Sequence, residues 1–216
     1  MGRKRKPRML DLFSGAGGAA RGYQLAGFHV TGVDNRPMPR YAGNVFIQAD
    51  AIAVLENQEF LRRFDAIHAS PPCQRYSQIP QCRKTQESWS NLIGPVRELL
   101  VGAGKPWVIE NVGGAPLMMP AMLCGSMFGL KTYRHRFFES STLFFTPEHS
   151  PHKEKCPPAG RRGIQEGSMI SICGHISQMT YARKVMGIDW MTRDELAQAI
   201  PPKYTEFIGH QLRNVV

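Results

Sequence analysis

The first half of the chain alternates short apolar runs with longer segments that have helical spacing. The apolar runs predict strands at 9–13, 29–33, 45–48, 65–69 and 107–112. The segments between them predict helices at 19–26, 56–63 and 92–101. Strands that alternate with helices in this way favour an α/β fold with a parallel sheet and right-handed crossovers.

The pattern changes after Gly113 and Gly114. Further short strands are predicted at 133–139, 143–145 and 168–172. An apolar patch rich in methionine is interpreted as core filler, and it comprises Met118, Met119, Met122, Leu123 and Met127.

Loops and helix signals complete the outline. Residues 77–90 are polar and poorly periodic, which predicts a long loop. Residues 146–167 are rich in Pro, Gly and basic side chains, which predicts a small irregular insert. A capping box from Thr192 to Glu195 predicts a helix over 195–199, and a last helix is predicted at 203–212.

Composition narrows the class of protein. The chain has 216 residues, of which 42% are hydrophobic, and its mean hydropathy of −0.30 is that of a water-soluble globular protein. It has no apolar run of membrane-spanning length, and residues 1–8 are basic without the apolar middle of a signal peptide. We therefore expect a cytoplasmic protein that does not enter membranes. Its five cysteines, an odd number, do not suit a disulfide framework.

The charge balance points to a polyanionic partner. Lys and Arg outnumber Asp and Glu by 27 to 17, which gives a net charge of +10. Basic residues gather in the arm at 1–8 and again at 153–162. Such an excess favours binding to nucleic acid, because neutralised phosphates release their counterions, although a solvated basic surface would look the same.

Cys73 is the first candidate for chemistry. It follows the predicted strand 65–69 and two prolines, Pro71 and Pro72, which fix the backbone of the loop. A free cysteine is usually a small buried hydrophobe. A stiff polar loop at the carboxyl end of a parallel strand is instead where an α/β sheet places its ligands, so we interpret Cys73 as a nucleophile.

Other polar residues end neighbouring strands. The glycine-rich turn at 14–18 precedes a predicted helix, whose free N–H groups suit a ligand. Asp34 follows about twenty residues later, where an acid can bind ribose hydroxyls, and Asp50 ends the third strand. Their alternative role is to cap turns or helices. Glu110 and Asn111 end the strand 107–112.

The insert contains possible metal ligands. His149, His152, Cys156, Cys173 and His175 have spacings that could assemble a structural zinc site. Because no Cys-x-x-Cys knuckle is present, we interpret the insert as an exposed polar loop and assign no metal ligand.

Five motifs, in this order, resemble those of the cytosine-C5 methyltransferases that act on nucleic acid, over most of the chain. They are DLFSGAGG at 11–18, PCQ at 72–74, ENV at 110–112, RHR at 134–136 and IG at 208–209. Thr132 stands where the family has Gln, and His210 where it has Asn. Only about seventy residues separate Arg136 from Gly209, which implies a much reduced target-recognition region.

The resemblance implies a fold and a domain organisation. The fold would be a Rossmann-like class I methyltransferase sheet, mostly parallel, with helices on both faces and a small irregular insert. The implied parts are a basic arm at 1–8, a catalytic domain at 9–140, the reduced insert at 141–185 and closing helices at 186–216.

It also implies an activity, namely methyl transfer from S-adenosylmethionine to C5 of cytosine in DNA, through a Cys–C6 adduct and a flipped-out base. The implied catalytic residues are Cys73, Glu110, Asn111, Arg134 and Arg136. The implied cofactor-binding residues are Asp11, Phe13, Ser14, Gly15, Ala16, Gly17, Gly18, Asp34, Asn35, Asp50, Ala51 and Pro72. The implied nucleic-acid-binding residues are Gln74, Arg75, Ser77, Arg83, Lys84, Arg161 and Arg162.

Other substrates and roles stay open at this point. The same chemistry suits cytosine in an RNA loop, whose bases are already unstacked, or a free cytidine nucleotide. A catalytically silent nucleic-acid-binding subunit is the alternative from another class. The DNA would be a duplex with a flipped cytosine or a single strand, bound by a monomer. The biological setting stays open between phage genome protection, restriction–modification and regulation.

Overall fold

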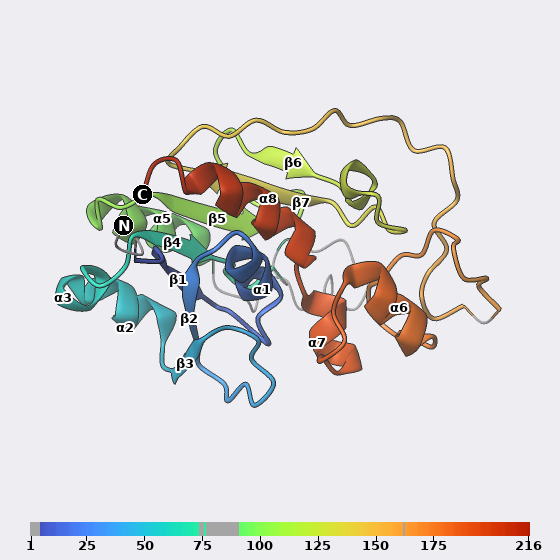
Figure 1. The fold of residues 1–216 in the computed structure, drawn as a ribbon, viewed down its shortest axis with the longest axis horizontal. Coiled ribbons are helices and arrows are strands. Elements are labelled where there is room, and N and C mark those ends of the chain that lie inside the picture. The colour runs from blue at the N-terminus through green and yellow to red at the C-terminus, as the bar shows by residue number, and fades with distance from the viewer. Residues whose placement is uncertain (1–4, 74–75, 77–90, 162) are drawn as a thin grey trace.

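Seven strands of the described chain form one sheet in the order β3-β2-β1-β4-β5-β7-β6 (Figure 1). The computed structural model describes residues 5–73, 76, 91–161 and 163–216. The strands are β1 (Arg8–Leu12), β2 (His29–Asp34), β3 (Val45–Gln48), β4 (Ala66–Ala69), β5 (Trp107–Asn111), β6 (Ala121–Leu123) and β7 (Arg136–Ser140). Strands β1 to β5 pair in parallel, and β7 is antiparallel to both β5 and β6.

Helices cover both faces of this sheet (Figure 1). They are α1 (Gly18–Leu25), α2 (Ala51–Glu56), α3 (Gln58–Leu61), α5 (Ile93–Gly102), α6 (Met179–Met186), α7 (Arg193–Gln198), α8 (Pro202–Leu212) and a 3₁₀ turn, η2 (Gly125–Phe128). One apolar cluster joins α1 and α8 to the sheet, and a second joins α2, α3 and α5 to its other face. A third cluster is built from α6, α7 and the insert, and it runs across the expected boundary at 185.

Alternation along the strands decides which side chains face α1 and α8. In β1, Met9 packs under α1 and α8 while Leu10 packs under α5. Strand side chains alternate between faces, so Asp11, His68 and Glu110 fall on the same face as Met9. All three are buried although they are polar or charged. One face of the sheet therefore carries a row of buried polar groups.

Helices α1 and α8 meet through glycines. A Cβ atom on Gly22 would lie 2.0 Å from Oγ1 of Thr205, and one on Gly209 would lie 2.6 Å from Cβ of Ala26. These positions permit a contact that any larger side chain would block. The Thr205 hydroxyl donates to the carbonyl of Ala19 at 2.8 Å, which fixes the two helices together.

Five of the predicted strands are confirmed within a residue or two, as are α1, α5, α7 and α8. The prediction of one helix over 56–63 was wrong. Two short helices, α2 and α3, occupy 51–61, because Asp50 accepts hydrogen bonds from two N–H groups of α2 and Asn57 accepts one in α3.

Several predictions in the second half were also wrong. Residues 143–145 form no strand, because the N–H and the carbonyl of Phe145 are bonded by the side-chain amide of Gln211 in α8 instead of by a neighbouring strand. Residues 168–172 contribute a single bridge, from Ser171 to Pro158. Met118 and Met119 are exposed rather than core, since the β5–β6 connection carries them outside the sheet. Strand β6 and helix α6 were not predicted.

The remainder of the chain follows the sequence-based outline. Residues 143–157 run outside the sheet, past β6 toward α6, without a helix or strand (Figure 1). The predicted loop at 77–90 lies outside the described residues. Within the part of the chain that is described, helices are too short or too polar to cross a membrane.

Candidate active site

A cavity of about 810 Å³ opens at the carboxyl ends of the parallel strands. Its walls come from the glycine turn, the ends of β2 and β5, the loop after β4, and the segment that contains α7. All the expected cofactor-binding residues except Gly17 line it, as do Cys73, Glu110 and Arg136. Lining residues at 191–200, which no motif signalled, complete its wall from the far end of the chain.

The glycine turn needs its glycines. Gly17 has a φ of 84°, and a Cβ there would lie 2.8 Å from the backbone nitrogen of Ala42. A Cβ on Gly18 would lie 2.5 Å from the carbonyl oxygen of Ile200. The turn thus brings bare backbone to the cavity and lets the residue before α8 pack directly on it.

Asp11 is a buried carboxylate without a counter-charge. It is fully buried, lines the cavity, and neither oxygen has a hydrogen-bond partner among the described residues. Burial raises the pKa of Asp11 well above its usual range, and the nearby Asp34 carboxylate raises it further. The backbone N–H of Ala20 lies close enough to act in the opposite direction, but it makes no hydrogen bond of ordinary geometry with Asp11 and does not overcome burial. A cationic ligand group would satisfy this position.

Asp34 and Asp50 have different local roles. Asp34 accepts a hydrogen bond from the N–H of Gly15 at 3.0 Å, so the acid at the end of β2 fixes the glycine turn. Asp50 accepts from the N–H groups of Ile52 and Ala53 at 2.9 Å each, which is the helix-capping role that the sequence left open. Both still line the cavity, together with Asn35 and Ala51.

The loop that carries Cys73 is attached to β5. The side-chain amide of Asn111 donates to the carbonyl of Pro71 at 2.9 Å, two residues before the thiol. Its oxygen accepts from the N–H of Val112. Asn111 is buried and does not line the cavity, so its contact is with the loop rather than with a ligand.

The free protein holds Cys73 as a thiol. Burial raises the pKa of Cys73, and the Glu110 carboxylate raises it further. Arg136 and Arg134 lower the pKa of Cys73, but by less than burial and Glu110 raise it. Cys73 thus needs a change in its surroundings before it can act as a thiolate.

Glu110 and Arg136 form a buried ion pair beside that thiol. Glu110 Oε1 lies 3.0 Å from Nε of Arg136. Burial raises the pKa of Glu110, while Arg136, a hydrogen bond from Ser70 and Arg134 all lower it. The net direction is upward, which favours a carboxyl group that keeps its proton nearer to neutral pH.

A hydrogen-bonded chain behind Glu110 was not predicted. His68 Nε2 lies 2.8 Å from Oγ of Ser70, and His68 Nδ1 lies 2.9 Å from the hydroxyl of Tyr23. Burial lowers the pKa of His68 to about 3, so the ring is neutral. If Ser70 donates to Glu110, it accepts from Nε2 of His68, and Tyr23 donates to Nδ1. The available signal was a histidine in an apolar strand, two residues before Ser70.

Arg134 is placed away from the cavity. Its guanidinium donates to the carbonyls of Ala197, Ala199 and Ile172, and the residue has a φ of 34°. Burial, and then the charge of Arg136, lowers the pKa of Arg134 to about 9. Its contacts tie the start of β7 to the segment that closes the cavity wall, which is a positioning role.

Most of the expected nucleic-acid-binding residues cannot be placed. Gln74, Arg75, Ser77, Arg83, Lys84 and Arg162 lie outside the described residues. Arg161 is exposed on the insert, which suits contact with a phosphate as well as with solvent.

The chain was compared with known protein families, curated proteins and solved structures. A model of the C-5 cytosine-specific DNA methylase family matches residues 7–116, just over half of the chain. A separate comparison with curated proteins finds no match.

Solved structures share the whole fold. The chain is similar to a candidate DNA modification methyltransferase encoded within a prophage of E. coli, with a TM-score of 0.68 and 14% identity, over 96% of this chain and 99% of that one. It is similar to the S. pombe Dnmt2 methyltransferase, with a TM-score of 0.61 and 14% identity over 98% and 99%. A Spodoptera frugiperda DNMT2 mutant has a TM-score of 0.61 and 12% identity over 96% and 99%.

At these identities the likeness concerns the fold, which is that of class I S-adenosylmethionine-dependent methyltransferases. The family match is the stronger finding about chemistry, because it runs from β1 past the end of β5. It therefore takes in the glycine turn, Cys73 and Glu110. From this match we conclude that the chain belongs to the C-5 cytosine-specific DNA methylase family.

Proposed function

We propose that this protein methylates C5 of cytosine in DNA, through a transient bond between Cys73 and C6 of the base. One observation carries the proposal. Cys73, Glu110 and Arg136 line the same cavity as the glycine turn. A base that reaches the thiol would thus lie beside the group that binds the methyl donor.

The methyl donor of the family is S-adenosylmethionine, and the cavity suits it. Asp11 offers an unpaired buried carboxylate to a cationic group, and the N-terminus of α1 leaves free N–H groups at the turn. Asp34 and Asp50 both line the cavity; Asp34 would accept from the ribose hydroxyls, and Asp50 would lie near the adenine. When bound, the donor supplies an electrophilic methyl group on a sulfonium sulfur.

The residues of this chain would do the rest. Cys73 Sγ, as a thiolate, adds to C6, and the electron pair of the C5–C6 bond moves toward C5 and the ring nitrogen N3. Protonated Glu110 donates to N3 as negative charge develops there. C5 would take the methyl group as the methyl–sulfur bond of the donor breaks and leaves a neutral thioether. A base would then remove the proton from C5, the C6–S bond would break to release Cys73, and the proton on N3 would return to Glu110.

The raised pKa values of Cys73 and Glu110 are consistent with this sequence of steps. The negative charge of Glu110 is one cause of the raised pKa of Cys73. A Glu110 that holds its proton on N3 no longer opposes the thiolate. Substrate binding would therefore favour ionisation of Cys73 at the moment when C6 is within reach.

The net charge of the chain and the position of the cavity support a nucleic acid as the substrate. The net charge of +10 suits a nucleic acid, which a free nucleotide would not require. A base stacked in a duplex cannot enter a cavity at the strand ends, so the cytosine would be flipped out. The prophage-encoded neighbour, a candidate DNA modification methyltransferase, supports DNA and a phage setting.

The test incubates the protein with radiolabelled S-adenosylmethionine and, in parallel, duplex DNA, tRNA and dCMP. We expect label in DNA as 5-methylcytosine, and none with Cys73→Ala. A duplex that contains 5-fluorocytosine should become covalently attached to Cys73, located by peptide mass spectrometry. Label in tRNA or dCMP alone would overturn the choice of DNA, and full turnover by Cys73→Ala would overturn the mechanism.

A further inference from the structure

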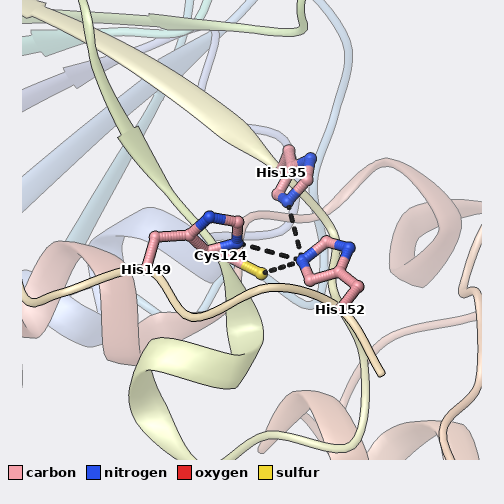
Figure 2. Close-up of side chains that lie close together, drawn as sticks. All are labelled: Cys124, His135, His149 and His152. Carbon is pink, nitrogen blue, oxygen red and sulfur yellow. Dashed lines mark hydrogen bonds between the residues drawn. The ribbon is translucent and has the colours of Figure 1, made fainter. Parts of the chain in front are cut away.

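Four metal-ligating side chains converge beside the start of β7, outside the active-site cavity. They are Cys124, His135, His149 and His152, called here the Cys-His₃ cluster (Figure 2). One nitrogen or sulfur atom of each lies within 4.8 Å of those of the other three. They come from the end of β6, the approach to β7 and the irregular segment after β7. The fold, rather than sequence proximity, brings them together.

The contacts converge on one nitrogen atom. Nε2 of His152 lies 3.0 Å from Nε2 of His149, 3.3 Å from Nε2 of His135 and 3.4 Å from Sγ of Cys124, as the dashed lines in Figure 2 show. A ring nitrogen carries either one proton or one lone pair, so it makes one ordinary hydrogen bond. Hydrogen bonding alone therefore does not account for three neighbours.

These separations suit a shared metal ion. With Zn–N bonds of about 2.0–2.1 Å and a Zn–S bond of about 2.3 Å, tetrahedral geometry places two nitrogens about 3.3 Å apart and a nitrogen about 3.6 Å from a sulfur. The three distances from His152 are within a few tenths of an ångström of those values. We propose that the Cys-His₃ cluster binds one Zn²⁺ ion as a structural site.

The donor set favours zinc over calcium or magnesium. Three imidazoles and one thiolate are nitrogen and sulfur ligands, whereas the hard cations select oxygen. Four protein ligands close the coordination sphere, which is typical of structural rather than catalytic zinc.

The surroundings of Cys124 suit a metal-bound thiolate. Its sulfur lies 3.0 Å from Oγ of Ser126, and its carbonyl accepts from the N–H of Met127 in η2 at 3.0 Å. Donors of this kind stabilise negative charge on a ligating sulfur. The buried Cys124 is thus held at the N-terminus of η2 and oriented toward the histidines.

Tyr133 holds the insert side of the cluster in place. Its ring stacks on His152, with centroids 3.5 Å apart and planes at 9°. Its hydroxyl donates to the carbonyl of Glu154 at 2.9 Å and accepts from the N–H of the same residue at 3.2 Å. His152 is therefore positioned before any ion arrives.

The proposed role follows from the segment that supplies two of the ligands. Residues 143–157 form no helix or strand, and Leu143 and Phe145 are exposed. A segment without a core of its own gains stability from a metal ion that ties it to the sheet. The ion would fasten this segment to β6 and β7.

The test uses the whole purified protein and the metal itself. We expect one zinc per chain by elemental analysis, a higher melting temperature on adding zinc to chelator-treated protein, and slower proteolysis within 143–157. Replacing zinc by Co²⁺ should give the visible absorption of a tetrahedral site, with a sulfur-to-cobalt band that Cys124→Ser removes.

Variants in the exposed part separate the ligands from the fold. His149→Ala with His152→Ala should weaken zinc binding by about 100-fold or more, while the matched control His175→Ala keeps it. His175 is exposed and is not among the four ligands. Three results would overturn the proposal: no stoichiometric zinc in wild type, undiminished binding in the double variant, or preference for Ca²⁺ or Mg²⁺ over Zn²⁺ at equal concentration.

Discussion

Glu110 Oε1 and Arg136 Nε lie 3.0 Å apart on neighbouring antiparallel strands, with only 8% and 13% of the two side chains exposed. Glu110 pairs with Phe138 in the register of β5 and β7, so Arg136 is its diagonal neighbour on the same face. The pair borders the thiol of Cys73 in the cavity. Removing either charge should therefore change the ionisation of two groups together.

Arg136→Met should shift activity to higher pH. Arg136 lowers the pKa of both Cys73 and Glu110, so its loss raises both. The pH–rate profile needs a thiolate on its rising limb and a protonated carboxyl on its falling limb, so both limbs move upward. We also expect kcat to fall by about 100-fold, since a charge that stabilises the reacting groups is gone. Measuring kcat against pH checks this.

The matched control is Arg97→Met. Arg97 makes a comparable ion pair, 2.6 Å long, with Glu139 on β7, but it does not line the cavity. This variant should lose stability and keep the wild-type pH profile. An unshifted profile in Arg136→Met would contradict the electrostatic argument.

Glu110→Gln should make Cys73 easier to ionise. The Glu110 charge raises the pKa of Cys73, and its removal leaves Arg136 and Arg134 to lower that pKa without an opposing charge. The pH midpoint of Cys73 alkylation by iodoacetamide, followed by peptide mass spectrometry, should move down even though turnover is lost. Glu139→Gln, on the neighbouring strand β7, is the control and should leave the midpoint in place. An upward shift in Glu110→Gln would refute this account.

Asp11→Asn should change how stability depends on pH. The pKa of Asp11 is raised in the folded protein, so between the unfolded and folded values the folded chain binds more protons. Wild-type unfolding free energy therefore falls as pH rises through that window, and the variant lacks this fall. The variant should be relatively more stable at neutral pH, by about 1.4 kcal/mol for each unit of pKa difference.

Urea denaturation from about pH 4 to about pH 8 measures that difference. The exposed Asp189 offers a control, since Asp189→Asn should follow the wild-type curve. If the unfolding free energies of Asp11→Asn and wild type differed by the same amount at every pH, ionisation of Asp11 would not be the cause of the difference. Binding of the methyl donor should weaken in Asp11→Asn.

Gly209→Ala should destabilise the packing of α8 on α1. The added Cβ would lie 2.6 Å from Cβ of Ala26, and overpacking of this kind costs about 1–3 kcal/mol. Gly94→Ala in α5, where a Cβ meets nothing within 4 Å, should be neutral or slightly stabilising. Equal melting temperatures for the two variants would show that the helices can separate without cost.

Sequence patterns over a few neighbouring residues predicted those strands and helices whose formation depends on such residues alone. Short apolar runs identified β1 to β5, and the capping box from Thr192 to Glu195 identified α7, because each depends on neighbouring residues alone. The exposed Leu143 and Phe145 show where this fails. Their apolar pattern resembles a strand, but the backbone of Phe145 bonds to the side chain of Gln211 in α8, a contact between distant residues that no local pattern reveals.

In the candidate site, too, residues that belong to local motifs could be predicted, and residues whose role depends on tertiary contacts could not. Cys73 and Glu110 could be predicted because each ends a strand within a short motif. His68 could not, because its role depends on Ser70 and Tyr23 meeting it across the sheet. The Cys-His₃ cluster was likewise hidden, since Cys124 and His135 come from strand ends. The sequence offered His149 and His152 only beside Cys156, Cys173 and His175, and no metal ligand was assigned there.

The backbone of Gly18 packs on the carbonyl of Ile200, so the cofactor turn takes its far wall from the segment just before α8. Undocking of α8 should therefore abolish affinity for the methyl donor even while strands β1 to β5 stay paired.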